Sequence, residues 1–117
     1  MLIYTHQSCI EHEIPPGHPE RPDRLVHLLK HLEDTGVSND FPLISAPKIS
    51  SAQVDIAHDL HYFSSLEEKI PYEGLEALDP DTWMSSRSLA AAEHAAGAVW
   101  QGVNDVISGR DQRVFCA

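Results

Sequence analysis

A long helical pattern close to the last strand is the feature that most constrains the fold of this chain. Between Ser86 and Ile107 the apolar residues recur every three or four positions, at Leu89, Ala92, Ala96, Val99, Val103 and Val106. Additional small residues flank this stripe, namely Ala90, Ala91, Ala95, Gly97 and Ala98. A helix with small or apolar residues around most of its circumference is predicted to be buried on more than one side, and Gly109 to end it.

Short β-prone segments flank the helical part of the chain. Leu2–Thr5 is predicted to be a buried strand, and Leu43 and Ile44 a short one. Val114, Phe115 and Cys116 follow one another within Arg113–Ala117, so this last strand is predicted to be buried on both faces. Strands joined by long helical crossovers predict an α/β layered fold with parallel pairing.

Three further helices and two loops are predicted between these strands. A helix begins near Pro22 and ends at Gly36, with one apolar stripe at Leu25, Leu28, Leu29 and Leu32. Ser50 or Ser51 is predicted to cap a short helix through Ile56, and His58–Lys69 to form another. The segments His6–Pro19 and Pro71–Asp81 are predicted to be loops.

Charge and composition exclude several classes of partner. Lys plus Arg is 8 and Asp plus Glu is 18, so the formal net charge is −10. This balance repels nucleic acid and anionic membrane surfaces. No apolar run reaches the length of a membrane span, and the N-terminus lacks a signal-peptide pattern, so we expect a cytoplasmic protein. Cys9 and Cys116 are expected to be reduced thiols.

Three segments in a fixed order carry a specific resemblance. The first is Gly17-His-Pro-Glu-Arg-Pro-Asp-Arg-Leu25, the second is Leu78-Asp-Pro-Asp-Thr82, and the third is the strand Val114–Ala117. Together they resemble the start of the histone deacetylase superfamily, closest to class II and to bacterial acetoin-utilisation or acetylpolyamine amidohydrolases. The resemblance implies the opening part of an arginase/deacetylase-like parallel-sheet sandwich, so 1–117 is expected to be a single, partial domain.

The resemblance assigns roles to residues of this chain. Asp81 matches a rim aspartate that accepts hydrogen bonds from the backbone amides of a bound acyl-lysine segment, with Asp79 as the weaker candidate. Arg24 matches an arginine of the internal channel for acetate release, and a guanidinium suits a carboxylate product. The first loop matches the family's pocket wall, through His6, Cys9, His12, His18 and Glu20.

The family's zinc chemistry is not represented in the sequence. In the family, Arg-Pro-Pro-Gly-His-His follows the strand that matches Val114–Ala117, and the zinc ligands and a catalytic Tyr come later. This chain is therefore expected to hold no zinc of its own and to be inactive alone, as the N-terminal fragment of a zinc-dependent hydrolase of acetyl-lysine or acetylpolyamine amides. Some class II relatives hold a second, structural zinc near the first loop.

Other interpretations stay open. Asp79–Thr82 also fits a cap and turn, and Arg24 an exposed ion pair with Glu20. Paired histidines at helical spacing, His27 with His31 and His58 with His61, fit exposed helix faces better than metal sites. A small metal-binding protein would use His6, Cys9 and His12. A non-catalytic module would associate with itself, or with a missing C-terminal half, through apolar surface on the last helix and strand.

Overall fold

A computed structural model describes all residues, 1–117, and its centre is a three-stranded parallel sheet. β1 (Leu2–Thr5) lies between β2 (Leu43–Ser45) and β5 (Val114–Cys116). Ile3 is in register with Leu43 on one side and with Phe115 on the other. The predicted α/β class and parallel pairing are therefore confirmed, including the short strand at Leu43.

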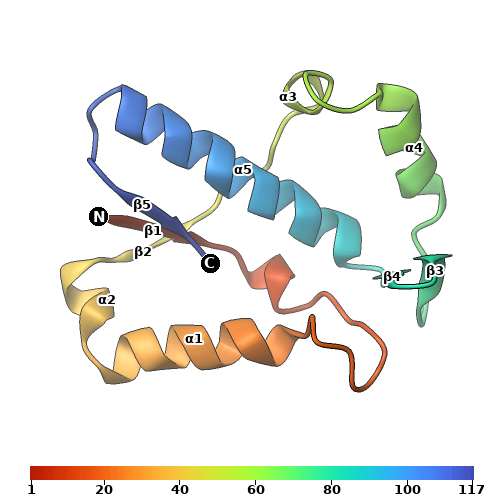
Figure 1. Cartoon of the computed structure of the whole chain (residues 1–117), viewed down its shortest axis with the longest axis horizontal. Helices are drawn as coiled ribbons and strands as arrows, with labels where there is room; N and C mark the ends of the chain where they lie inside the picture. The colour runs from red at the N-terminus through yellow and green to blue at the C-terminus, as the bar shows by residue number, and fades with distance from the viewer.

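Helices connect and cover the strands. α5 (Ser88–Ile107) packs on β1 and β5, and Figure 1 draws it on the opposite side of the strands from α1 (Pro22–Asp34). Shorter helices complete the chain: a 3-10 turn η1 (Gln7–Cys9), α2 (Val37–Asp40), α3 (Ser51–Val54) and α4 (Leu60–Glu68). None of these helices has both the length and the apolarity to cross a membrane.

Residues predicted to begin or end α1 and α3 do so in the structure. Pro22 occupies the first turn of α1, and Gly36 follows the helix with a left-handed φ of 75°. Ser50 caps α3 through a capping box with Gln53, in which each side chain bonds the other residue's backbone N–H. The leucine stripe of α1 is half-buried along its length.

The segment predicted as the loop Pro71–Asp81 contains a strand instead. β3 (Glu76–Asp79) pairs antiparallel with β4 (Thr82–Met84), and Ala77 lies opposite Trp83. The strand escaped prediction because its outward side chains are acidic or small and its register is irregular between Ala77 and Asp79. Backbone pairing in a two-stranded hairpin, rather than an apolar face, defines it.

The predicted apolar stripe of α5 is also corrected. Apart from Leu89, its members are exposed, and the helix instead buries Ala91, Gly97, Ala98, Gly102 and Asp105. The small residues face the neighbouring segments because they allow close approach. A Cβ on Gly97 would collide with the carbonyl of Pro47, and one on Gly102 would lie 2.8 Å from Val114 Cγ1. The residues that α5 buries are therefore those small enough for close approach of its neighbours, the backbone of Pro47 at Gly97 and the side chain of Val114 at Gly102.

The sequence predicts that the last strand is buried on both faces, and this prediction is wrong. Phe115 and Cys116 are exposed, because β5 is an edge strand and α5 covers only one of its faces. The core is correspondingly small and centres on Tyr4, Ala46 and Ala98. Much apolar surface of α5 and β5 is left in contact with solvent.

Candidate functional site

The first loop, the β3–β4 hairpin and the start of α5 enclose a pocket of about 380 Å³. The first loop contributes Cys9, His12, Ile14, His18 and Glu20. Asp81 and the residues of β4 form a second side, and the small residues of α5 together with Leu66 of α4 form the rest. The structure thus brings together five residues that the sequence analysis singled out, from segments more than sixty positions apart.

A contact between His18 and Asp81 joins the two sides of the pocket. His18 Nε2 lies 3.1 Å from Asp81 Oδ1, and the backbone N–H of Glu20 donates to His18 Nδ1 at 3.2 Å. With Nδ1 accepting, Nε2 carries the proton that is donated to Asp81. This hydrogen bond raises the pKa of His18 above its ordinary value, although partial burial of the ring opposes the shift.

Asp79 orients the turn that presents Asp81. Its Oδ1 accepts a hydrogen bond of 2.8 Å from the backbone N–H of Asp81. Hydrogen bonds from Asp81 and Thr82 lower the pKa of Asp79, which therefore stays ionised. Asp79 acts as a turn residue at the hairpin tip, whereas the Asp81 side chain is 92% exposed and directed by the turn and by His18. Of the alternative interpretation of Asp79–Thr82 as a cap and turn, only the turn is present, because the segment connects β3 to β4 and no helix begins there.

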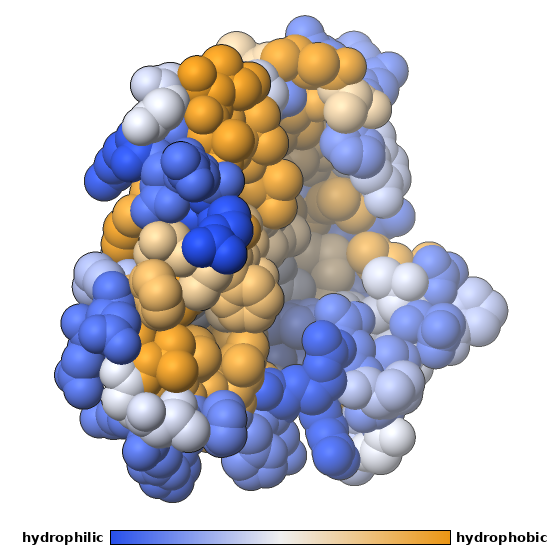
Figure 2. All heavy atoms as spheres, turned by 60° about the vertical axis from the view of Figure 1, so that its left-hand side comes forward, coloured by the Kyte–Doolittle hydropathy of each residue, from blue (hydrophilic) through white to orange (hydrophobic).

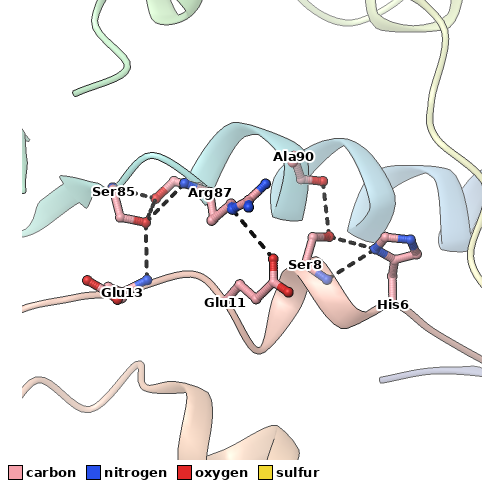
Figure 3. Close-up of polar contacts among 8 residues, drawn as sticks. His6, Ser8, Glu11, Glu13, Ser85, Arg87 and Ala90 are labelled. Carbon is pink, nitrogen blue, oxygen red and sulfur yellow. Dashed lines mark hydrogen bonds and ion pairs between the residues drawn. The ribbon is translucent and has the colours of Figure 1, made fainter. Parts of the chain in front are cut away.

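Polar contacts fasten the first loop to the start of α5 (Figure 3). His12 Nδ1 lies 2.7 Å from the hydroxyl of Ser88, and the backbone N–H of Glu13 donates to Ser85 Oγ at 3.2 Å. Ser85 N–H in turn donates to Ser88 Oγ at 2.7 Å, and Arg87 pairs with Glu11 at 3.6 Å. These contacts fix the position of the pocket wall relative to the helix.

Cys9 is held as a protonated thiol rather than as a nucleophile. Its Sγ–H donates to the carbonyl of Ala91 at 3.7 Å, and burial raises the pKa of the thiol. The side chain therefore serves as part of the wall at neutral pH.

Three of the predicted site residues do not line the pocket. His6 contacts Ser8 and stacks on His94, and Asp79 lies outside the pocket beneath the hairpin turn. Arg24 is exposed on α1, and its guanidinium contacts neither Glu20 nor any other carboxylate. The channel role of Arg24 stays a prediction.

The side chains present do not fit a zinc centre. No three His, Cys, Asp or Glu side chains converge on a common point. In the first loop, His6 bonds Ser8, Cys9 bonds Ala91 and His12 bonds Ser88, so the three candidate ligands face separate partners. The exposed pairs His27 with His31 and His58 with His61 likewise lack further ligands. We derive no chemical step through a metal held by this chain.

Sequence reasoning missed several lining residues. Trp83 and Met84 of β4 line the pocket, as do Ser88 at the start of α5 and Leu66 of α4. The position of Trp83, two residues after Asp81, was an available signal. The roles of Leu66 and Ser88 depend on tertiary packing and have no local signature.

Comparison with known proteins decides the family. A family model described as the histone deacetylase domain matches residues 18–117. The chain belongs to the histone deacetylase family. The family indicated by the three sequence segments is therefore confirmed.

Individual relatives are similar over nearly the whole of this deacetylase-family chain. Type-2 histone deacetylase 2 of Dictyostelium discoideum is 28% identical over 100% of this chain and 8% of that protein. A probable deacetylase of Archaeoglobus fulgidus is 28% identical, with 97% of this chain and 32% of that protein covered. The crystal structure of the HDA15 HD domain superposes with a TM-score of 0.88 at 24% identity, covering 98% of this chain and 33% of that chain.

The histone deacetylase-family chain spans about a third or less of the length of each of these relatives. Its parallel sheet and helices correspond to part of the HDA15 HD domain, which confirms the predicted fold class.

Proposed function

We propose that this chain forms one wall of the substrate pocket of an amidohydrolase that acts on N-acetyl amides, on acetyl-lysine or an acetylpolyamine. The observation that carries the proposal is the placement of Asp81. Its exposed carboxylate stands at the pocket described above, with Oδ1 held by His18 and Oδ2 free. A carboxylate accepts several hydrogen bonds, so it is suited to receive backbone N–H groups of an extended ligand.

The chain by itself is proposed to bind without catalysing hydrolysis. Its sequence contains no adjacent pair of histidines, and its acidic and histidine side chains do not gather into a metal centre. In the proposal, zinc belongs to intact relatives, and the cytoplasm, where Cys9 and Cys116 stay reduced, is the place of action. An amide-hydrolysis assay with an acetyl-lysine peptide and with an acetylpolyamine should give no turnover above buffer, with or without added zinc.

Binding of an acetyl-lysine peptide tests the pocket itself. In a Trp100→Phe background, the fluorescence of Trp83 reports on the pocket. We expect a saturable change that is weakened about tenfold or more by Asp81→Ala, the loss of about 1.4 kcal/mol that one charge-assisted hydrogen bond provides. Glu73→Ala, an exposed carboxylate outside the pocket, is the matched control. Equal binding by the wild type and Asp81→Ala would contradict the proposal.

A second candidate function, a self-associating or partner-binding module, is supported by a different surface. A groove of about 320 Å³ lies between α5 and β5, lined by Val99, Gly102, Val103, Val106, Ile107, Val114 and Cys116. Figure 2 shows a band of apolar side chains on the side of the molecule that it brings forward. The groove adjoins the unpaired outer edge of β5, which is a template for strand pairing.

We propose a second copy of this chain as the partner for that surface, because an edge strand pairs readily with its own copy around a two-fold axis. A missing C-terminal half is the alternative partner. Sedimentation equilibrium at moderate salt should show a species larger than 13.0 kDa, and Val103→Asp should shift it toward the monomer. A single 13.0 kDa species across all concentrations would refute self-association.

A further inference from the structure

Two histidine rings from distant parts of the chain are stacked on each other. His6, at the end of β1, and His94, in the middle of α5, have ring centroids 3.4 Å apart and planes within 8° of parallel. Neither ring lines the pocket. The pair nevertheless stands directly before the η1 turn, whose last residue, Cys9, is part of the pocket wall.

Backbone contacts fix the proton positions of both neutral rings. The N–H of Ser8 donates to His6 Nδ1 at 3.2 Å, and the Ser8 hydroxyl lies 2.8 Å from the same nitrogen. Because the N–H can only donate, Nδ1 is an acceptor in the neutral ring and the ring proton is on Nε2. His94 Nδ1 lies 2.8 Å from the carbonyl oxygen of Ala46, which can only accept, so this nitrogen carries a proton. In this arrangement His6 caps η1, and His94 bonds the segment after β2.

A proton on His6 Nδ1 is incompatible with the cap of η1. Protonation places a donor at Nδ1, where the ring now accepts from Ser8 N–H, so this bond is lost and the Ser8 hydroxyl, 2.8 Å from Nδ1, is left as the acceptor for the new proton. A proton on His94 Nε2, in contrast, leaves the bond to Ala46 intact. Two cationic rings at 3.4 Å would also repel each other in a partly buried site. The pair therefore tolerates one added proton, and the proton that breaks a contact is the one on His6.

The surrounding charges do not remove this conflict. Burial, followed by repulsion from His94, lowers the pKa of His6, and the carboxylate of Glu11 opposes the shift. Glu11 is itself paired with Arg87 at 3.6 Å. On the other side, Glu93 of α5 is paired with Lys48, from the segment after β2, at 2.6 Å. The carboxylates of Glu11 and Glu93 are therefore each paired with a basic side chain other than the two histidines.

We propose that the His6–His94 pair is a proton-operated clasp for the pocket wall, in which neutral His6 holds the η1 turn against α5 and protonated His6 releases it. Release of η1 breaks the contact of Cys9 with Ala91 and opens the wall of the pocket. The clasp positions the wall whatever ligand the pocket receives, so it stands independently of the proposed substrate.

Thiol labelling of Cys9 measures the opening directly. In a Cys116→Ser background, the rate of reaction with 4,4′-dithiodipyridine is measured from pH 8 to pH 5 and divided by the rate of a small free thiol. The pH stays below the pKa of Cys9 and of the free thiol over this range, so the ratio of the two rates changes only with the accessibility of Cys9. We expect a flat ratio above pH 6.5, the ordinary pKa of histidine. Below it, the ratio should rise by up to about tenfold per pH unit, because one proton is taken up on opening.

Two variants separate the clasp from general acid effects. In His6→Asn, the side-chain oxygen still accepts from Ser8 N–H but does not titrate, so the ratio should stay flat to pH 5. In His94→Asn, the amide still donates to Ala46 without charge, so the rise should be smaller than in the parent. A flat profile in the parent protein, or the same rise in His6→Asn, would overturn the proposal. If His6→Asn does not fold, an unchanged rise in His94→Asn overturns it.

Discussion

His18 Nε2 and Asp81 Oδ1 are 3.1 Å apart, and this contact joins the first loop to the tip of the β3–β4 hairpin. The two residues are 63 positions apart in the sequence. The contact holds one carboxylate oxygen of Asp81 and leaves the other free. Its strength depends on the charge of His18, since a protonated imidazole attracts the carboxylate more than a neutral one.

Asp81→Asn should lower the pKa of His18, because the hydrogen bond to the Asp81 carboxylate is the main cause that raises it. A raised histidine pKa contributes stability below the ordinary value of 6.5, and this contribution is lost as the pH rises through the pKa of the folded state. An NMR pH titration of the His18 ring measures the shift. Glu73→Gln is the control, and an unchanged His18 titration in Asp81→Asn would show that the pair does not form in solution.

Asp105→Ala should lower the free energy of unfolding by about 3 kcal/mol, because it removes the partner of several polar groups in and around the core. Asp105, 3% exposed, accepts from Tyr4 Oη at 2.6 Å, Gln101 Nε2 at 2.9 Å and Arg110 at 3.2 Å. Tyr4→Phe removes one of these bonds and should cost about 1 to 2 kcal/mol. Chemical denaturation measures both changes, with the exposed Asp34→Ala as a control expected below about 0.5 kcal/mol.

The same network predicts a dependence on pH. Hydrogen bonds, led by that of Tyr4, lower the pKa of Asp105 below its ordinary value of 3.8 despite its burial. The stability that the carboxylate contributes is present above that value and is lost as the pH falls through the lower pKa of the folded state. The difference in unfolding free energy between the wild type and Asp105→Asn should therefore shrink in acid. A constant difference between pH 7 and pH 3 would contradict the assigned ionisation.

The sequence correctly predicted the helices whose start and stop signals lie at or near their own ends. The leucine stripe of α1, Pro22, Gly36 and the Ser50 cap act within a few residues, and each was found where the sequence places it. The α5 helix was predicted, but its buried face was not. Periodicity identifies apolar positions, and it does not show that Gly97 faces the backbone of Pro47 and Gly102 the side chain of Val114, while Val99 and Val103 face solvent.

The candidate site was also predictable only in part, because the sequence identifies some of its residues but not the contacts between distant segments. The family resemblance singled out residues in two segments, and the structure shows that Asp81 and His18 meet. The Asp79 side chain acts locally, on the N–H two residues further on, and a turn there was among the sequence interpretations, whereas the partnership of Ser88 with His12 arises from a tertiary contact. No spacing in the sequence encodes a contact between a loop and a helix that begins about seventy residues later.

Ser88→Ala should loosen the pocket wall. The Ser88 hydroxyl contacts His12 Nδ1 at 2.7 Å and accepts from Ser85 N–H at 2.7 Å, so its removal leaves both groups without this partner. We expect a loss of about 1.5 kcal/mol in unfolding free energy. Hydrogen exchange should also become faster in the first loop. Ser86→Ala, at an exposed neighbouring position, should change stability by less than about 0.5 kcal/mol, and equal effects of the two variants would argue against the contact.

Gly97→Ala should destabilise the protein, although alanine is the better helix former. A Cβ at this position meets the carbonyl of Pro47 and lies 2.9 Å from the backbone nitrogen of Ile49. Both are backbone atoms, so relief requires α5 to move away from the segment after β2. The move would also strain the backbone bond of 3.0 Å from Ile49 N–H to Glu93. We expect a loss of at least about 2 kcal/mol by chemical denaturation. Ala96→Gly, at the adjacent exposed position, should cost only the helix propensity of about 1 kcal/mol. Stabilisation by Gly97→Ala would show that α5 does not pack against Pro47.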